Sequence, residues 1–295
     1  MNNDFFPRFE AYKVLVNDAI STFYIGNSQI TMTIEAALYS LMGNSKRIRP
    51  VLMISVGEIL GIDKDDILPY ACALEMIHTY SLIHDDLPGM DNDDFRRGHP
   101  TCHIQYSEAL AILAGDSLLN RAYEMLFESS ASGSQQLKAA AYMCKMAGNE
   151  GMIGGQTLDI LAQEKTLDAK NLACMHQMKT GGLLKAAVLV PVLFSGQDAF
   201  FTDFQSFAEH MGLAFQIKDD LLDVTKTKEQ LGKSAGKDER DQKSTYVSLY
   251  GLEQAEKLLE EECGAALSAL QSLERKGLNM QFLYEMNKFL LEREF

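Results

Sequence analysis

The chain has 295 residues, of which 46% are hydrophobic and 23% are charged, and its formal net charge at pH 7 is −14. This composition excludes a disordered chain, and the acidic balance argues against nucleic acid or a membrane surface as a partner, because both are negatively charged. The length fits one large domain or two smaller ones.

Neither a targeting segment nor a membrane-spanning segment is predicted. The N-terminal residues include Asp4 and Glu10 and lack the cationic start and apolar run of a secretory signal. The most apolar stretch, residues 183–194, contains Lys185 and Pro191, so we interpret it as a buried core helix. The five cysteines lie far apart and form no CxxC pair, which favours buried free thiols in a reducing cytoplasm over a zinc site or a catalytic thiol. We therefore expect a cytoplasmic protein without membrane insertion.

Apolar residues recur at helical spacing along the chain, and few prolines interrupt the segments that show this spacing. In chain order, helices are predicted at about residues 8–24, 31–42, 47–60, 71–85, 105–128, 135–149, 167–178, 182–195, 201–224, 253–274 and 279–293. No strand is predicted, and no Pro/Ser/Gly-rich linker divides the chain. The predicted fold class is therefore all-α, with residues 1–295 as a single domain.

The first acidic cluster, residues 85–94, contains five aspartates in ten positions and follows the helical stripe 71–85. Pro88 and Gly89 interrupt the helix after Asp85. This irregularity could bring Asp91 back beside Asp85, as a shared metal ion would require. A solvated acidic loop is the alternative interpretation.

The second acidic cluster, Asp219, Asp220 and Asp223, follows an apolar run at residues 211–217. At about 100° per residue, Asp219 and Asp223 share one helix face. Three like charges on one turn repel each other unless a cation holds them, and oxygen ligands without His or Cys select hard ions such as Mg²⁺. A solvated acidic face is the alternative.

Basic residues accompany both clusters. They are Lys46, Arg47 and Arg49 at the start of a predicted helix, Arg96 and Arg97 after the first cluster, and Lys179 before a Thr-Gly-Gly sequence. Each alone is most often a surface charge. Together with two carboxylate clusters, they indicate a substrate with several phosphates, bound partly through Mg²⁺ and partly by Arg and Lys directly.

The ordered set of motifs resembles the trans-isoprenyl diphosphate synthase family over nearly the whole chain. Residues 46–50 are similar to its KRxRP segment, 85–91 to its first aspartate motif in the bacterial form DDxxxxD, 96–98 to the following RRG, 114–119 to AGDxLL, 154–156 to GGQ, 179–180 to KT, and 215–223 to FQxxDDxxD. Four positions depart from the usual pattern: Asn44 and Ser45 replace two glycines, His99 replaces a lysine, and Cys102 replaces an asparagine. The chain is most similar to the bacterial, farnesyl-forming members.

The resemblance implies the isoprenoid synthase fold, an antiparallel helical bundle around a deep central cavity, and a homodimer. It also implies condensation of isopentenyl diphosphate with dimethylallyl or geranyl diphosphate by ionisation, condensation and elimination. The released pyrophosphate is the base favoured for the last proton, so no dedicated catalytic His or Glu is expected.

The same resemblance assigns roles to individual residues. More than one Mg²⁺ ion would be held by Asp85, Asp86, Asp91, Asp219, Asp220 and Asp223. The catalytic set would be Asp85, Asp91, Asp219, Lys179, Thr180 and Gln216. The substrates would be bound by Lys46, Arg49, His78, Arg96, Arg97, Lys179, Thr180, Gln216 and Lys233. Residues 232–234 lack the strand and first glycine of a phosphate-binding P-loop, so we interpret residues 225–244 as a flap that closes over the diphosphates.

Product length is expected to depend on the residues one turn before the first aspartate. Farnesyl-forming bacterial relatives have an aromatic residue five positions before it and Ser next, and here these are Tyr80 and Ser81. Helix geometry aligns Ser81 with Asp85 and places Tyr80 about 100° round the helix, so the ring would have to reach in from the side. A C15 product is predicted on the resemblance.

Three other functions remain as alternatives. A geranylgeranyl or other short-chain synthase would differ only in the depth of the cavity. A non-catalytic partner subunit is disfavoured because both acidic clusters are complete, and a terpene cyclase because Lys46, Arg49 and His78 would form a second diphosphate site.

The net charge is compatible with this substrate. Without the eight aspartates of the two clusters, 33 acidic residues stand against 27 basic ones and the balance is −6 instead of −14. Bound Mg²⁺ would reverse the local sign there and allow the clusters to receive a diphosphate.

Overall fold

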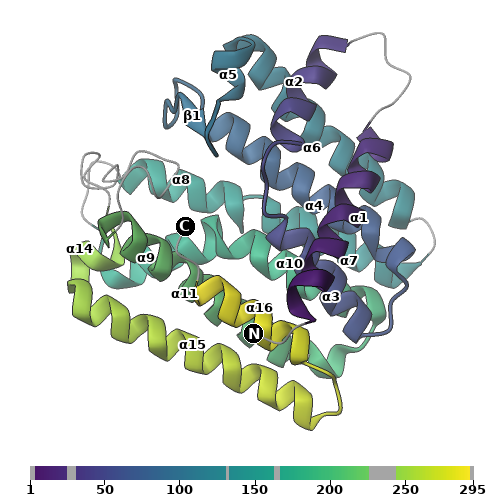
Figure 1. Ribbon diagram of the computed structural model, residues 1–295, viewed down its shortest axis with the longest axis vertical. Helices are drawn as coiled ribbons and strands as arrows, with labels where there is room; N and C mark the ends of the chain where they lie inside the picture. The colour runs from purple at the N-terminus through teal and green to yellow at the C-terminus, as the bar shows by residue number, and fades with distance from the viewer. Residues whose placement is uncertain (1–3, 25–30, 131–132, 163–166, 226–243, 293–295) are drawn as a thin grey trace.

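Helices make up most of the computed structural model, which describes residues 4–24, 31–130, 133–162, 167–225 and 244–292 (Figure 1). The N-terminal part contains α1 (Phe5–Tyr24), α2 (Thr31–Leu41), α3 (Ile48–Ile59), α4 (Lys64–Asp85), the strands β1 (Phe95–Arg96) and β2 (His99–Pro100), α5 (Cys102–Gln105), α6 (Glu108–Ser130) and α7 (Ser134–Ala147). The remainder contains α8 (Met152–Ala162), α9 (Ala169–Lys179), α10 (Gly181–Ser195), η1 (Asp198–Phe200), α11 (Phe201–Thr225), α14 (Tyr246–Tyr250), α15 (Leu252–Arg275) and α16 (Gln281–Glu292).

The all-α prediction is confirmed, and each predicted helix has a counterpart. Three helices, α5, α8 and α14, were not predicted. The prediction of no strand is wrong at one place, where Phe95 pairs with Pro100 and Arg96 with His99 in a two-stranded antiparallel hairpin. Two residues per strand are too few to show an alternating pattern in the sequence.

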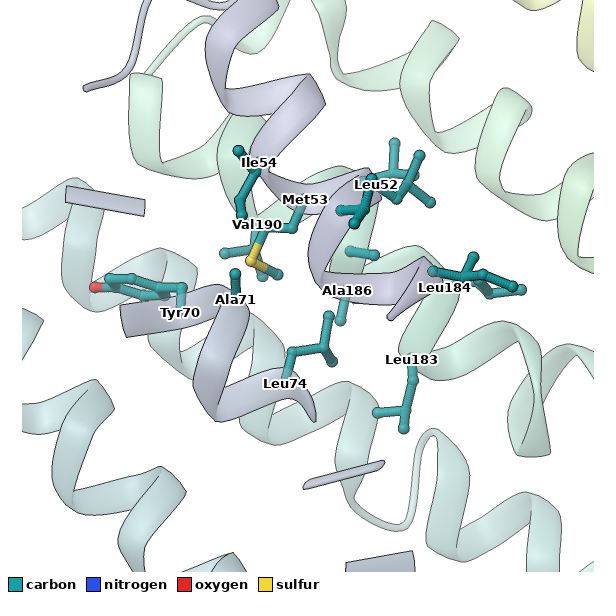
Figure 2. Packing of buried hydrophobic residues seen from close by; sticks show 14 of the residues in the cluster. Leu52, Met53, Ile54, Tyr70, Ala71, Leu74, Leu183, Leu184, Ala186 and Val190 are labelled. Atoms are coloured by element: carbon teal, nitrogen blue, oxygen red, sulfur yellow. The ribbon is translucent and has the colours of Figure 1, made fainter. Parts of the chain in front are cut away.

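The core forms where α3, α4 and α10 pack together (Figure 2). Leu52 and Ile54 of α3, Leu74 of α4, and Leu184 and Val190 of α10 are almost completely buried there. The apolar stretch 183–194 is thus a core helix, as predicted. The same hydrophobic cluster extends from α1 to α16, and this continuity supports our proposal that residues 1–295 form one domain.

A smaller cluster lies apart from this core, between α9, α11, α14 and α15. Its buried members are Leu172, Met175, Ile217, Leu221, Tyr246 and Ala255. This cluster fixes α9 against the part of α11 that carries the second acidic cluster.

Local signals in the sequence set the ends of the helices that carry the acidic and basic motifs. Asp63 begins α4 by accepting a hydrogen bond from the backbone N–H of Asp65. From there α4 runs to Asp85, which places the first acidic cluster at its C-terminal end. The axes of α9 and α10 meet at 52°, with Thr180 at the break, so Lys179 and Thr180 project from a corner.

The described part of the chain has no single helix with the length and apolar composition needed to cross a membrane; α9 and α10 meet that test only as a bent pair. All five cysteines are free thiols, as predicted, but only Cys72 and Cys102 are buried, and Cys174 is exposed.

Candidate active site

The first acidic cluster forms a tight turn at the end of α4. The backbone N–H of Asp91 donates to the carbonyl oxygen of Asp85 at 2.9 Å, and that of Asp93 donates to the carbonyl oxygen of Asp86 at 3.2 Å. Asn92 takes a positive φ of 50°, a conformation that asparagine tolerates. The expected return of Asp91 to the side of Asp85 is therefore observed.

The Asp85 carboxyl group lies in an unfavourable setting for its charge. Burial raises its pKa above the ordinary value, and the neighbouring charges of Asp91 and Asp86 raise it further. Lys179, from α9, acts in the opposite direction and lowers it. A cation placed between these carboxylates would relieve the repulsion.

Asp86 has a structural environment different from that of Asp85. It is 3% exposed, and Arg96 binds it through Nε at 2.8 Å from Oδ1 and 2.9 Å from Oδ2. This pair attaches the β1–β2 hairpin to the end of α4. The Asp86 carboxylate is thus already held by protein donors, the Nε and Nη2 groups of Arg96.

Helix α8 connects the first acidic cluster to Lys179. The side-chain amide of Gln156 donates to Asp85 Oδ1. One turn later, Asp159 accepts a hydrogen bond from Lys179 Nζ at 2.5 Å. Gln156 lies within a motif that was identified in the sequence, whereas Asp159 was not predicted. Its spacing of three residues from Gln156, on the same helix face, is the signal that could have identified it.

The second acidic cluster is linked to the same corner. Thr180 Oγ1 donates to Gln216 Oε1 at 3.1 Å, and Gln216 Nε2 donates to Asp220 Oδ1 at 2.9 Å. The other oxygen of Asp220 accepts the backbone N–H of Tyr246 at 2.8 Å. Asp220, like Asp86, is therefore buried and held by protein donors, whereas Asp219 and Asp223 are half-buried.

These contacts bring the predicted residues into one site. Gln156 contacts Asp85, Lys179 influences the Asp85 carboxyl, and Thr180, the next residue, contacts Gln216. Residues more than 130 positions apart in the chain thus converge on the corner between α9 and α10.

A cationic group lies at the start of α3, and its charges act on His78 of α4, about two turns before Asp85. Arg49 Nη1 lies 3.3 Å from His78 Nε2, and Lys46 is exposed. Burial and the charges of Arg49, Arg97, Arg96 and Arg47 lower the pKa of His78 well below its usual value, in decreasing order of effect. His78 is therefore neutral at pH 7 and accepts from Arg49. Several cations around one neutral imidazole make a receptor for an anion.

The predicted chain-length residues lie on α4 behind the first cluster. Tyr80 is 6% exposed, its ring centroid is 5.8 Å from that of His84, and burial raises its pKa to about 12. Its hydroxyl has no hydrogen-bond partner among the described residues. Ser81 Oγ donates to the carbonyl oxygen of His78 at 2.8 Å. Tyr80 is thus a packed aromatic side chain, as a floor to a cavity would need.

The four departures from the family pattern lie near the β1–β2 hairpin and the loop before α3. Asn44 and His99 are exposed, whereas Ser45 and Cys102 are buried. A cavity of about 150 Å³ lies here, lined by Asn44, Thr79, Asp86, Arg97 and Cys102 among others. This cavity adjoins the cationic group, and the deep central cavity remains an expectation. Lys233 and most of the predicted flap lie outside the described residues.

The carboxylates fit a magnesium ion that arrives with a phosphorylated ligand. Within the described ranges, no group of three His, Cys, Asp or Glu side chains is arranged to hold a metal unaided. Mg²⁺ is usually bound by one or two carboxylates together with substrate phosphates, not by an all-protein cage. The oxygen-only donors at Asp85, Asp91 and Asp219 agree with that mode.

Known proteins are similar to this chain in sequence and in structure. A farnesyl diphosphate synthase from Geobacillus stearothermophilus is 44% identical over 256 residues, covering 85% of this chain and 86% of the relative. A geranylgeranyl diphosphate synthase from Cyanophora paradoxa is 45% identical over 259 residues, covering 84% and 85%. The structure of a Helicobacter pylori geranyltransferase complexed with magnesium and isoprenyl diphosphate has a TM-score of 0.81 and 30% identity, covering 97% of this chain and 96% of that one.

Residues 31–275 match the polyprenyl synthetase family over most of the chain, including both acidic clusters and the basic residues around His78. The fold, the order of the motifs and the convergence of the two clusters agree with this match. The chain belongs to the polyprenyl synthetase family.

Proposed function

We propose that this protein is a prenyltransferase that condenses isopentenyl diphosphate with dimethylallyl and then geranyl diphosphate to form farnesyl diphosphate, a C15 product. The observation that carries the proposal is the series of contacts from Asp85 through Gln156, and from Lys179 and Thr180 to Gln216. These contacts bring two acidic clusters and a lysine together at the corner between α9 and α10. A separate cationic group lies at the start of α3. Two diphosphates with different binding modes fit such a site.

Asp85, Asp91 and Asp219 are the residues that would hold Mg²⁺, and we propose more than one ion. When bound, Mg²⁺ supplies Lewis-acid neutralisation of the charge that develops on a departing pyrophosphate. Asp223 is half-buried on the same helix face as Asp219 and is a further candidate. Asp86 and Asp220 would support these ligands by fixing the hairpin and α14, since their oxygens already accept protein hydrogen bonds.

Lys179 binds the diphosphate of the allylic substrate, together with Arg96 and Lys233. Asp159 holds the Lys179 ammonium group in place at 2.5 Å. As the C–O bond breaks, positive charge develops on the allylic carbon, and the oxygens of Thr180 and Gln216 face it as fixed dipoles. Their mutual hydrogen bond orients these oxygens before the reaction.

Lys46, Arg49, His78 and Arg97 bind the isopentenyl diphosphate. Because His78 is neutral and receives a hydrogen bond from Arg49, the positive charge at this site belongs to the arginines and the lysine. Holding the second substrate with its double bond toward the allylic carbon supplies much of the rate gain. The released pyrophosphate takes the last proton.

Buried Tyr80 supports a C15 product over the geranylgeranyl alternative. Its ring packs on α4 one turn behind Asp85, where a growing chain that extended along this helix would meet it. A smaller residue there would leave room for another isoprene unit.

We further propose a cytoplasmic homodimer. Helix α6 exposes the large apolar side chains Ile112, Leu113 and Phe127, which a second copy of the chain would cover. The five free thiols agree with a reducing compartment.

Pyrophosphate release by the purified protein tests the transfer reaction. We expect release that requires Mg²⁺ and both dimethylallyl and isopentenyl diphosphate, and that stops when a chelator is added. Asp85→Asn and Asp219→Asn should each lower kcat about a hundredfold or more, since metal neutralisation contributes several kcal/mol. Release without isopentenyl diphosphate would favour a cyclase or hydrolase, and complete inactivity would favour a non-catalytic subunit.

A further inference from the structure

A buried ion pair between α4 and the loop before α3 is the starting point. Arg47 Nη1 lies 2.8 Å from Glu75 Oε1, and both side chains are 2% exposed. Two charges are removed from water only at a large free-energy cost, which good geometry and further hydrogen bonds must offset. The proposed reaction assigns neither residue a contact with a substrate.

The other two nitrogen atoms of the Arg47 guanidinium also donate hydrogen bonds. Its Nε donates to Asn17 Oδ1 of α1 at 2.9 Å, and its Nη2 donates to the carbonyl oxygen of Leu41 at the end of α2 at 2.5 Å. One guanidinium therefore ties α1, α2 and α4 to the start of α3.

Ser45 adds a third member to this pair. Its hydroxyl donates to Glu75 Oε1 at 2.8 Å and accepts the backbone N–H of Arg47 at 3.3 Å. Ser45 occupies one of the positions at which the chain departs from the family pattern, and a glycine there could not make either contact. The Glu75 oxygen thus holds the loop at two points.

The backbone at Arg47 depends on these contacts. Arg47 has φ 54° and ψ 30°, a left-handed conformation that costs free energy for a residue with a Cβ atom. Lys46 and Arg49 flank it, and Arg49 contacts His78, which lies one turn after Glu75 on α4. Burial lowers the pKa of the Arg97 guanidinium, and the nearby charge of Glu75 acts in the opposite direction.

We propose that Glu75, through Arg47 and Ser45, is a positioning residue for the isopentenyl diphosphate site. It holds the loop in the conformation that directs Lys46 and Arg49 toward His78, and it contributes to the binding of the second substrate but not of the allylic one. The inference rests on the proposed function and assigns a role to groups that this function leaves unused.

Ser45→Ala is the first test, because it removes one hydroxyl and leaves the buried charges paired. We expect the KM for isopentenyl diphosphate to rise about tenfold, with kcat and the KM for dimethylallyl diphosphate within about twofold of the wild type. Calorimetric titration with isopentenyl diphosphate alone should show the same loss of affinity. Unchanged affinity for isopentenyl diphosphate, or an equal rise in both KM values, would overturn the proposal.

Glu75→Gln is the second test, with Glu58→Gln as the matched control. Glu58 of α3 also has an arginine partner at 2.8 Å, Arg8, but this pair lies at the surface away from the site. Glu75→Gln should raise the KM for isopentenyl diphosphate at least as much as Ser45→Ala, and the control should leave it unchanged. Ser45→Ala should add little in the Glu75→Gln background, since both act through one oxygen.

If Glu75→Gln does not fold, the effect of Ser45→Ala on isopentenyl diphosphate binding alone decides whether this network positions the site. Additive effects of the two substitutions would contradict action through Glu75. A lower melting temperature with no change in affinity would show a role in stability alone. Wild-type protein that releases no pyrophosphate would instead contradict the proposed function.

Discussion

In the proposed reaction, some side chains would contact the metal or the substrates, and others would hold those side chains in position. The first aspartate of each pair, Asp85 or Asp219, is only partly buried, whereas the second, Asp86 or Asp220, is buried and accepts protein hydrogen bonds. Sequence alone marks both members as carboxylates. Their different tasks follow from partners that the fold supplies, namely Arg96 and the backbone of Tyr246.

Tyr80 is the residue expected to limit product length. Tyr80→Ala should extend the main product from C15 to C20, because removing the ring opens space behind the first acidic cluster, and it should also destabilise the fold by about 3–5 kcal/mol. Chromatography of the dephosphorylated products measures the change. Tyr80→Phe is the control and should keep C15, since the hydroxyl has no partner among the described residues. Unchanged C15 output from Tyr80→Ala would refute Tyr80 as the stop.

His176 should make stability depend on pH. Burial lowers its pKa from 6.5 to about 4, and its ring stacks on Tyr246 at 5.7 Å. The unfolded chain therefore binds a proton between these pH values and the folded chain does not. The contribution of His176 is complete above about pH 6.5 and falls by about 1.4 kcal/mol per pH unit below it.

Urea unfolding at pH 7.5 and 5 measures this effect, with His176→Phe as the reference. The variant keeps an aromatic ring for stacking and shares every other titrating group, so those contributions cancel in the comparison. The wild type should lose more stability than the variant on acidification. Equal losses would mean that His176 is not buried as described.

At the scale of the elements, α8 is the main result that the sequence did not predict. Glycines at positions 148, 151, 154 and 155 weaken the helical pattern, because glycine is a poor helix former. They are needed for close packing: a Cβ atom on Gly155 would collide with the backbone of Lys179. The glycines that made α8 difficult to predict therefore allow the close packing that brings Gln156 and Asp159 to the site.

Longer helices were predictable because their apolar residues recur at helical spacing over several turns. The turn at Pro88 and Gly89 was also anticipated, together with the return of Asp91. The α14 helix and the hairpin were not, because each is too short to show a periodic pattern. Hydrogen bonds between distant segments, such as that of Asp220 to Tyr246, leave no pattern in one sequence.

Gly155→Ala tests the packing of α8 on α9. It should lower the free energy of unfolding by about 1–3 kcal/mol through overpacking, and it should reduce kcat because Lys179 is displaced. Chemical denaturation and steady-state kinetics measure the two effects. Gly264→Ala in α15 is the control: a Cβ atom there meets nothing within 4 Å, so the substitution should be neutral or stabilising. Equal effects of the two variants would contradict the close approach.

For the whole molecule, the distribution of charge matters more than its sum. The chain carries −14, yet Arg47, Arg49, Arg96 and Arg97 gather around a neutral His78 while the acidic clusters occupy the neighbouring corner. In the proposed reaction, the acidic clusters would receive a metal-bound diphosphate and the arginines would receive the second diphosphate. The net charge disfavours nucleic acid but places no restriction on this substrate.

Sizing the product of the wild-type protein tests directly whether it condenses prenyl diphosphates to a C15 product. Purified protein is incubated with Mg²⁺, isopentenyl diphosphate and dimethylallyl diphosphate, and the dephosphorylated products are separated by chain length. We expect farnesol as the main species, with geraniol at short times. Neither alcohol should form without Mg²⁺. Geranylgeraniol as the main species would contradict the C15 assignment, and the absence of any prenyl alcohol would contradict the proposed reaction.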